Sequence, residues 1–317
     1  MTVSRVPLAE ALDEGVVVLD GGLSNQLVDQ GCDLSDPLWS ARVLADEPGQ
    51  IEAAHAAYVR AGARVLITGS YQATYEGFAR RGVGAAETSA LLRRSVELAR
   101  GAAESGREET GGPGPRVWVA ASVGPYGAML ADGGEYRGRY GLGVRELERF
   151  HRPRIEALCE AGPDVLALET VPDADEAEAL LRAVEGTGVP VWLSYTIAGE
   201  ATRAGQPLDR ALGLLAGHDQ VIAAGVNCCD PRDADRAVEI AAAVTGKPVV
   251  VYPNSGETWD ADARAWRGGS TYDPARVRAW RSAGARLIGG CCRVGPDRIA
   301  ELAALLGGEA DPREQLL

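Results

Sequence analysis

The chain has 317 residues, of which 46% are hydrophobic, and its formal net charge is −13. This length suits one large enzyme domain, because α/β barrels often exceed roughly 250 residues as a single domain. The 45 acidic residues outnumber the 32 Lys and Arg, which argues against a nucleic-acid partner, since phosphate binding needs clustered cations. The chain opens without a signal-peptide pattern, and no apolar run approaches the roughly 20 residues that span a bilayer. We expect a cytoplasmic protein whose partners are small molecules, not nucleic acid or a membrane.

Eight short apolar runs have the composition of buried strands. They are rich in Val, Ile and Leu without strict alternation, which is typical of parallel strands covered on both faces. In chain order they are 16–20, 64–70, 117–123, 165–170, 190–196, 221–227, 248–253 and 286–290. Between them lie stretches of helical character, rich in Ala, Leu and Glu, among them 50–61, 84–104, 144–160, 173–185, 231–244 and 295–306.

This alternation predicts a closed (β/α)8 barrel, with an open doubly wound sheet as the alternative. We expect residues 1–306 to form the barrel as a single domain and the acidic segment 307–317 to be a frayed tail. Residues 105–116 are expected to form a polar surface connection, and 124–143 a Gly- and Tyr-rich loop. Closure of that loop over a bound ligand is one hypothesis, and an idle insertion is the other.

Uncommon residues collect where the predicted strands end, and the carboxyl ends of the strands carry the working loops of such a barrel. These ends read Asp20-Gly21-Gly22, Thr68-Gly69-Ser70-Tyr71, Glu169-Thr170, Asn227-Cys228, Pro253-Asn254-Ser255-Gly256 and Gly290-Cys291-Cys292. The sequence therefore predicts the functional face before any chemistry is assigned.

The six cysteines do not form the pattern of a secreted disulfide framework, and a reducing compartment would keep them as thiols. Cys228 ends the sixth strand, whereas Cys291 and Cys292 follow the eighth, so no single loop supplies a metal site. Because these two strand ends lie near each other on a barrel rim, the three thiolates are expected to converge on one tetrahedral ion. Zinc fits best, with three soft sulfur ligands and an open fourth position for substrate.

The charge of this ligand set indicates which chemistry it supports. Three thiolates leave Zn²⁺ with a net charge near −1, which makes it a weak Lewis acid and a poor generator of hydroxide. A substrate thiol, by contrast, has an ordinary pKa near 8.5 and loses its proton on coordination, while its sulfur stays nucleophilic. The site is suited to attack by a substrate thiolate on carbon.

Other interpretations of the cysteines remain open. Cys32 and Cys159 are interpreted as small buried apolar residues. Cys229 is an alternative ligand to Cys228, although the residue that ends the strand is favoured. The set could also be a structural zinc site, a redox disulfide or the switch of a thiol-based redox or metal-sensing protein, but a sensor has no need of Asp20 and Glu169 at other strand ends.

These motifs resemble the homocysteine S-methyltransferase family. The match runs from Asp20-Gly21-Gly22-Leu23-Ser24 through Gly225-Val226-Asn227-Cys228 to Gly289-Gly290-Cys291-Cys292, in the order of the family and over nearly the whole chain. The resemblance implies a (β/α)8 barrel in which Cys228, Cys291 and Cys292 hold zinc.

The resemblance also implies the contacts of the substrate. Asp20 and Glu169 are expected to meet its amine, and backbone N–H groups near Gly21-Gly22, with help from Thr68, its carboxylate. An ammonium needs carboxylates, and glycines let backbone donors approach an anion closely. Asn227 is expected to orient the cysteine loop or the substrate. The structural alternatives are a loop cap for Asp20, a rim ion pair for Glu169 and a turn role for Asn227.

Three segments look like those of family members that use S-methylmethionine or S-adenosylmethionine: Tyr71-Gln72-Ala73, Tyr195, and Tyr252-Pro253-Asn254-Ser255-Gly256-Glu257 with Trp259. A sulfonium leaves as a neutral thioether without a general acid, and aromatic faces and carboxylates can hold it. This agrees with the three histidines, which fall away from the predicted rim: His55, His151 and His218.

The resemblance therefore implies zinc-dependent methyl transfer from a sulfonium to homocysteine, giving methionine. Betaine and methylcobalamin are weaker donor alternatives, and we expect no cobalamin-binding module after the barrel. A partner protein that carries methylcobalamin stays possible, as does selenocysteine or another thiol as the acceptor.

Overall fold

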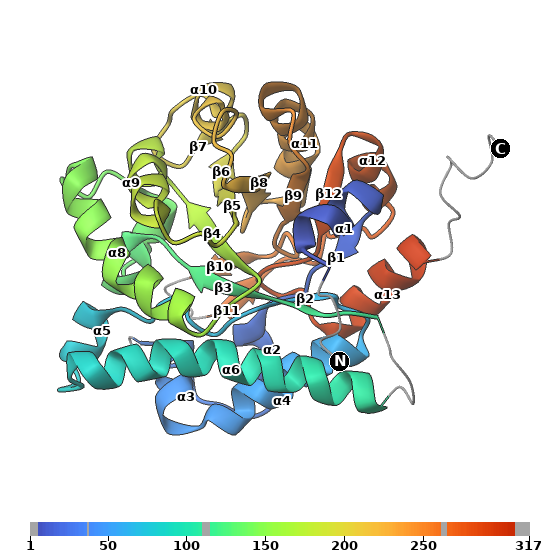
Figure 1. Cartoon of the computed structure of the whole chain (residues 1–317). Coiled ribbons are helices and arrows are strands. Elements are labelled where there is room, and N and C mark those ends of the chain that lie inside the picture. Colours follow the sequence, from blue (N-terminus) through green and yellow to red (C-terminus); the bar gives the residue numbers. More distant parts are fainter. Residues whose placement is uncertain (1–5, 37, 110–114, 261–264, 308–317) are drawn as a thin grey trace.

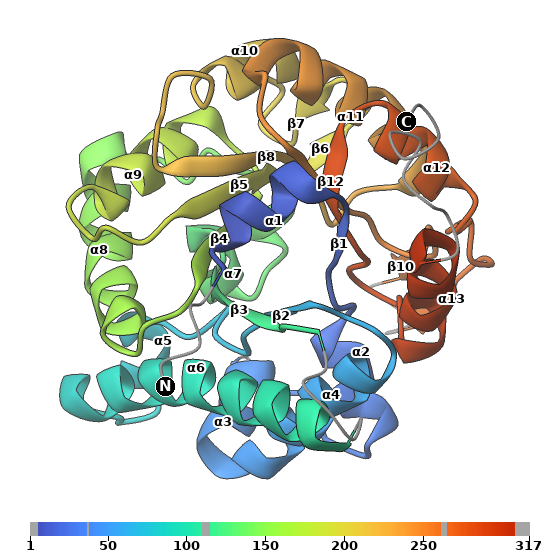
Figure 2. The same cartoon turned by 45° about the vertical axis from the view of Figure 1, so that its right-hand side comes forward.

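The computed structural model of the chain describes residues 6–36, 38–109, 115–260 and 265–307. All eight predicted strands are present and form one parallel sheet in the order β1-β12-β9-β8-β5-β4-β3-β2. A parallel bridge between Leu19 and Val65 joins the first strand to the second and closes the ring. The fold is therefore the predicted (β/α)8 barrel, not an open sheet (Figures 1 and 2).

The strands are short and almost wholly buried, as their apolar composition predicts. Their bounds are β1 Val17–Val18, β2 Val65–Ile67, β3 Trp118–Val123, β4 Val165–Val171, β5 Val191–Tyr195, β8 Val221–Asn227, β9 Val249–Tyr252 and β12 Ala285–Ile288. Two small antiparallel hairpins extend the loops after β5 and β9: β6 Ile197–Ala198 with β7 Ala201–Thr202, and β10 Thr258–Asp260 with β11 Ala265–Arg267.

Helices surround the barrel, and their apolar faces pack on the outside of the sheet (Figure 2). The six predicted helices are α4 Pro48–Arg60, α6 Ala85–Glu109, α8 Val144–Glu160, α9 Ala174–Val184, α11 Pro231–Thr245 and α13 Pro296–Gly307. Shorter helices are α2 Leu23–Asp29, α3 Ser40–Asp46, α5 Tyr75–Ala79, α10 Leu208–Gly213 and α12 Arg276–Ser282. Within the described part of the chain, no helix is long and apolar enough to cross a membrane.

A separate cluster fills the inside of the barrel. Helix α1 (Leu8–Glu14) lies across one end of it in Figure 2 and contributes Leu8 and Leu12. These side chains join the same cluster as Trp118 and Val165, which begin their strands, and Trp192. Helix α1 therefore closes the amino-terminal end of the barrel and leaves the carboxyl ends of the strands as the accessible rim.

The connection predicted over 105–116 is partly wrong, because α6 continues to Glu109. The helix persists through Gly106, where an added Cβ would lie only 2.3 Å from Cγ1 of Val59 on α4. This close approach between helices favours glycine, so Gly106 serves packing and does not end the helix. Residues 110–114 of the predicted connection lie outside the described residues, and so do residues 308–317 of the predicted tail, whose first residue, Gly307, ends α13.

The segment 124–143 is more ordered than the plain loop that was expected. It contains helix α7 (Tyr126–Leu130) and a 3-10 turn, η1 (Gly134–Tyr136). The ring of Tyr126 packs between those of Tyr140 and Phe150, with centroid distances of 5.2 Å and 4.8 Å. Aromatic packing therefore holds this segment against α8 at the rim.

Candidate metal and substrate site

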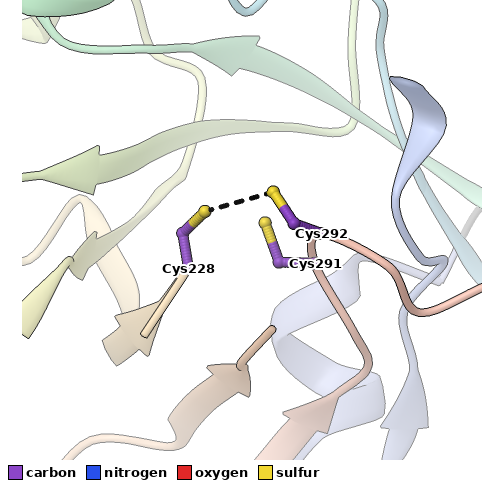
Figure 3. Close-up of side chains that lie close together, drawn as sticks. All are labelled: Cys228, Cys291 and Cys292. Carbon is purple, nitrogen blue, oxygen red and sulfur yellow. Dashed lines mark hydrogen bonds between the residues drawn. The ribbon is translucent and has the colours of Figure 1, made fainter. Parts of the chain in front are cut away.

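Three cysteine sulfurs meet at the carboxyl ends of β8 and β12. The Sγ atoms of Cys228, Cys291 and Cys292 all lie within 4.8 Å of one another, and those of Cys228 and Cys292 are 3.7 Å apart (Figure 3). Two sulfurs bound to one tetrahedral zinc at about 2.3 Å each stand roughly 3.8 Å apart. The donor set and this separation therefore fit a zinc ion.

The segment 252–255 at the end of β9 connects the two cysteine loops, because β9 lies between β8 and β12 in the sheet. Its backbone carbonyls accept the N–H of Cys228 at 3.1 Å and that of Cys291 at 2.8 Å. The side-chain Oδ1 of Asn254 accepts the N–H of Cys292 at 3.1 Å. From the sequence, segment 252–255 was associated with binding of the methyl donor. Its place between the two strands that carry the cysteines could have predicted that it also supports the cysteine loops.

The structure separates Cys228 from its neighbour Cys229. Cys228 has a φ of +51°, which is uncommon for a residue with a side chain, and its sulfur faces the other two. Cys229 is fully buried in the hydrophobic core and lies outside the three-sulfur group. Cys32 and Cys159 also pack with the core. The strand-end residue is thus the one whose geometry suits a ligand.

Without a cation, the three thiols compete for negative charge. Hydrogen bonds from Cys228 and Cys291 hold the pKa of Cys292 well below its usual value. Hydrogen bonding with Cys228 and Cys292 raises the pKa of Cys291. One thiolate is therefore stabilised by two thiols, and a bound metal ion would favour deprotonation of the other two.

Two buried carboxylates at the rim, Asp20 and Glu169, interact electrostatically. Asp20 accepts the N–H of Ile67 through Oδ2 at 2.8 Å, but its Oδ1 has no hydrogen-bond partner among the described residues. Glu169 accepts hydrogen bonds from Ser122 and, at 3.0 Å, from the hydroxyl of Tyr252. Burial raises the pKa of Asp20 and raises that of Glu169 to about 7, and the charge of Glu169 also raises the pKa of Asp20.

These carboxylates have the surroundings of a cation-binding site. In the part of the chain that the structure describes, no basic side chain forms an ion pair with Asp20 or Glu169. A bound ammonium would supply the missing donor for Asp20 and offset the cost of burying both charges. The geometry does not support a rim ion pair for Glu169.

The glycines of the first rim loop allow it to pack against the last cysteine loop. An added Cβ would lie 2.1 Å from the carbonyl oxygen of Val294 at Gly21 and 2.7 Å from that of Cys291 at Gly22. The Gly22 N–H already donates to the Val294 carbonyl at 2.9 Å. Substrate carboxylate binding near Gly21-Gly22 stays a prediction, and the Gly22 N–H is engaged within the protein. Tyr58, which sequence reasoning missed, donates its hydroxyl to the Gly22 carbonyl at 3.1 Å.

Asn227 holds a strained residue beside Glu169. Its Oδ1 accepts the backbone N–H of Thr170 at 2.7 Å and the hydroxyl of Ser194 at 2.8 Å, while its Nδ2 donates to Thr170 Oγ1 at 2.8 Å. Thr170 has a φ of +57°, which is unfavourable for a β-branched residue. The position of Asn227 therefore favours orientation of the strand end that carries Glu169.

Thr68 belongs to the same hydrogen-bonded region. Its Oγ1 accepts the backbone N–H of Ser122 at 3.0 Å and shares a hydrogen bond of 2.7 Å with Ser70. Because Ser122 also contacts Glu169, Thr68 supports the wall of the carboxylate site. Its direct contact with a substrate carboxylate stays a prediction.

The segment 124–143 brings two residues to the cysteines that sequence reasoning did not single out. The hydroxyl of Tyr136 lies 3.1 Å from Sγ of Cys228. The guanidinium carbon of Arg203 lies 5.5 Å from the centre of the Tyr136 ring, within cation–π range. Glu135, in the same turn, has a partly exposed side chain with a buried Oε2. The Gly- and Tyr-rich composition after the third strand was the sequence feature that could have indicated that Glu135 and Tyr136 belong to the site.

The histidines take no part in the three-cysteine group. His55 and His151 are fully buried in α4 and α8. His151 contacts Glu176 at 2.9 Å through Nε2. Among the described residues, the only group with metal-ligand spacing is the three cysteines.

The fold and the site define a (β/α)8-barrel protein with a three-thiol centre beside a pair of buried carboxylates. Residues 17–306 match the sequence profile of the homocysteine S-methyltransferase family. The chain is 46% identical over 306 residues to the homocysteine S-methyltransferase of Escherichia coli (strain K12), covering 94% of this chain and 98% of that protein. It is 43% identical to homocysteine S-methyltransferase YbgG of Bacillus subtilis (strain 168), covering 94% and 97%.

A solved structure agrees with these sequence matches. The metallated form of the homocysteine methyltransferase MmuM from Escherichia coli superposes with a TM-score of 0.86 at 44% identity, covering 95% of this chain and 100% of that one. The present chain belongs to the homocysteine S-methyltransferase family, and its enzyme class is methyltransferase.

Proposed function

We propose that this enzyme transfers a methyl group from a sulfonium donor, S-methylmethionine or S-adenosylmethionine, to the sulfur of L-homocysteine. Cys228, Cys291 and Cys292 would hold Zn²⁺, which when bound supplies the positive charge that favours the thiolate form of the acceptor. The observation that carries this proposal is the convergence of three sulfurs at the same rim as two buried carboxylates that form no ion pair within the described part of the chain. Family membership supports homocysteine as the acceptor.

In this proposal the carboxylates orient the acceptor. Asp20 offers its unpartnered Oδ1 to the ammonium, and Glu169 is fixed by Ser122 and Tyr252 to receive the same group. The substrate carboxylate is assigned to the region of Gly21 and Thr68. Holding both ends of the amino acid places its sulfur at the cysteine cluster and lowers the entropic cost of reaction.

The transfer itself is a displacement at the methyl carbon. The acceptor thiol loses its proton on binding, and its sulfur then forms the new bond to carbon while the bond from carbon to the donor sulfonium breaks. The electron pair of that bond stays on the donor sulfur, which leaves as a neutral thioether. No general acid is required, in keeping with the absence of histidine from the described cysteine group.

The protein also contributes a covered site. The hydroxyl of Tyr136 lies 3.1 Å from Sγ of Cys228, so segment 124–143 reaches the cluster. We propose that segment 124–143 covers the bound donor, and hydrogen exchange in it should slow when both substrates are added. Exchange that stays unchanged would contradict a lid. The enzyme is expected to act in the cytoplasm, where its six cysteines remain free thiols.

The test is methionine formation together with zinc content, on reduced protein given homocysteine and S-methylmethionine, beside Cys291→Ala. We expect about one zinc per chain and methionine from the unaltered enzyme, with both lost in the variant. Zinc without turnover for either sulfonium would refute the proposed donors and return betaine, methylcobalamin or a selenocysteine acceptor to consideration. A reduced preparation that binds no zinc would favour thiol redox chemistry instead.

A further inference from the structure

Glu135 is a carboxylate at the rim that the contacts proposed for homocysteine do not use. It lies in η1, and its Oε2 is buried without a hydrogen-bond partner in the described part of the chain. The pKa of Glu135 is raised to about 7, chiefly by burial, and the charge of Cys228 contributes to this rise. A buried carboxylate charge of this kind is costly unless a positive charge offsets it, so a cationic ligand would stabilise it.

The carboxylate approaches the cysteines from the loop side. The hydroxyl of the next residue, Tyr136, lies 3.1 Å from Sγ of Cys228, and the charge of Glu135 contributes to the raised pKa of Tyr71. Asp20 belongs to a strand end instead. Two separate parts of the chain therefore bring carboxylates to the surroundings of the cluster: the strand ends, and segment 124–143, where Tyr136 stands beside Glu135.

The position of Glu135 is fixed by packing. An added Cβ at Gly127 would lie 2.3 Å from the carbonyl carbon of Gly134 and 2.4 Å from the nitrogen of Glu135, so α7 and η1 are in direct contact. The guanidinium of Arg137 is engaged by Asp132, with Nη2 2.9 Å from Oδ2. Packing therefore holds the turn, and the guanidinium of Arg137 forms its ion pair with Asp132.

We propose that Glu135 recognises the positive sulfonium centre of the methyl donor, an inference that rests on the proposed function. A sulfonium has no N–H or O–H and cannot donate a hydrogen bond. A carboxylate instead attracts its positive charge, and the faces of tyrosine rings can contact it. Displacement in line requires the donor sulfur on the side of the methyl carbon opposite to the acceptor sulfur. With homocysteine held from the strand ends, the donor lies on the side of Glu135. Loss of the methyl group removes the charge and weakens binding of the product thioether.

The first measurement needs no variant. The carbon isostere of S-methylmethionine, 2-amino-5-methylhexanoic acid, has a CH group in place of the sulfonium sulfur and keeps the ammonium and carboxylate. At saturating homocysteine, we compare its inhibition constant against S-methylmethionine with the KM of S-methylmethionine. We expect the sulfonium to bind at least about tenfold more tightly, as a partly desolvated charge pair should. Equal binding of the two compounds would overturn the inference.

The second measurement uses Glu135→Gln, which keeps the shape of the side chain and removes its charge. The KM of S-methylmethionine should rise about tenfold or more, while the inhibition constant of the isostere, the KM of homocysteine and the zinc content change by less than about twofold. Glu178→Gln is the matched control, because it removes a carboxylate that pairs with Arg182 on the outer face of α9 with 42% of its side chain exposed. This control should leave all four values unchanged.

The outcomes separate the inference from the proposed function. An equal loss of affinity for the sulfonium and its isostere in Glu135→Gln would mean that Glu135 binds the donor ammonium, which overturns the inference. Unchanged kinetics would overturn it too, while methionine formation still upheld the proposed function. Failure of the unaltered enzyme to form methionine from either sulfonium would overturn both.

Discussion

The two ends of the barrel differ in how they pair their carboxylates. Asp164, before β4, accepts the backbone N–H of Val119 at 2.8 Å and pairs with Arg100 and Arg116 at 2.7 Å each. Asp20, after β1, accepts the N–H of Ile67, while its Oδ1 has no hydrogen-bond partner among the residues that the structure describes. One end satisfies its charges and supports the fold, whereas the other leaves a charge unsatisfied for a ligand.

Backbone geometry follows the same division. Thr170 and Cys228 both have positive φ values, and both lie at the carboxyl ends of the strands beside the candidate site. Strain of this kind persists only where the surroundings hold it, as Asn227 does for Thr170. The comparison indicates that the rim gives up stability for function.

The largest expected effect is the difference between substitutions of the adjacent residues Cys228 and Cys229. Cys228→Ser should lower zinc content to near zero and methionine formation by at least about a thousandfold, because one of three ligands is weakened. Cys229→Ser should keep zinc and activity but lower the free energy of unfolding by about 1–3 kcal/mol, since it places a hydroxyl in the core. Metal analysis and urea unfolding of both variants test this, and loss of zinc in Cys229→Ser alone would reverse the assignment.

A smaller effect compares the two ends directly. Asp20→Asn should raise the KM of homocysteine about a hundredfold, because the ammonium loses a charged partner, with no loss of stability. Asp164→Asn should lower the free energy of unfolding by about 2 kcal/mol, because Arg100 and Arg116 lose their ion pairs at the amino-terminal end of the barrel. The KM of homocysteine should stay unchanged. Urea unfolding and steady-state kinetics decide. A destabilised Asp20→Asn with an ordinary KM would break the comparison.

The smallest effect is a pH dependence of stability in the metal-free protein. Burial raises the pKa of Glu169 to about 7 in the folded state from an ordinary 4.5. Between those values the folded protein keeps a proton that the unfolded chain releases, so this contribution to stability is present below pH 4.5 and lost as the pH rises through 7. The stability of Glu169→Gln relative to the unaltered protein should therefore rise by about 1–3 kcal/mol from about pH 5 to about pH 8. A constant difference in unfolding free energy would contradict the buried-carboxylate account.

The sequence was sufficient for the barrel because each strand is a Val- and Ile-rich run between helical stretches. It also indicated which strand ends carry cysteines and carboxylates, since a parallel barrel brings all carboxyl ends to one face. The predicted end of α6 was wrong because glycine usually weakens a helix. Only the contact with α4 shows that Gly106 allows close packing against Val59.

Other parts of the site depend on contacts between distant segments. Asn254 reaches Cys292 across the rim, and Asn227 reaches Thr170 on β4, neither of which any local pattern encodes. The sequence predicted that backbone N–H groups near Gly22 bind the substrate carboxylate, but in the fold the Gly22 N–H donates to the carbonyl of Val294. The roles of Tyr136 and Glu135 could not be predicted, because they lie in a glycine-rich segment whose helix and turn depend on aromatic packing.

The most direct test of the account is proton release when homocysteine binds to the zinc-loaded enzyme without donor. Calorimetry in two buffers with different ionisation enthalpies counts those protons, and homoserine, which has a hydroxyl in place of the thiol, corrects for protons released by Asp20 and Glu169. We predict a difference of about one proton per ligand between homocysteine and homoserine, because the thiol binds as a thiolate. Equal proton release for the two ligands would contradict thiolate activation at the three-cysteine site.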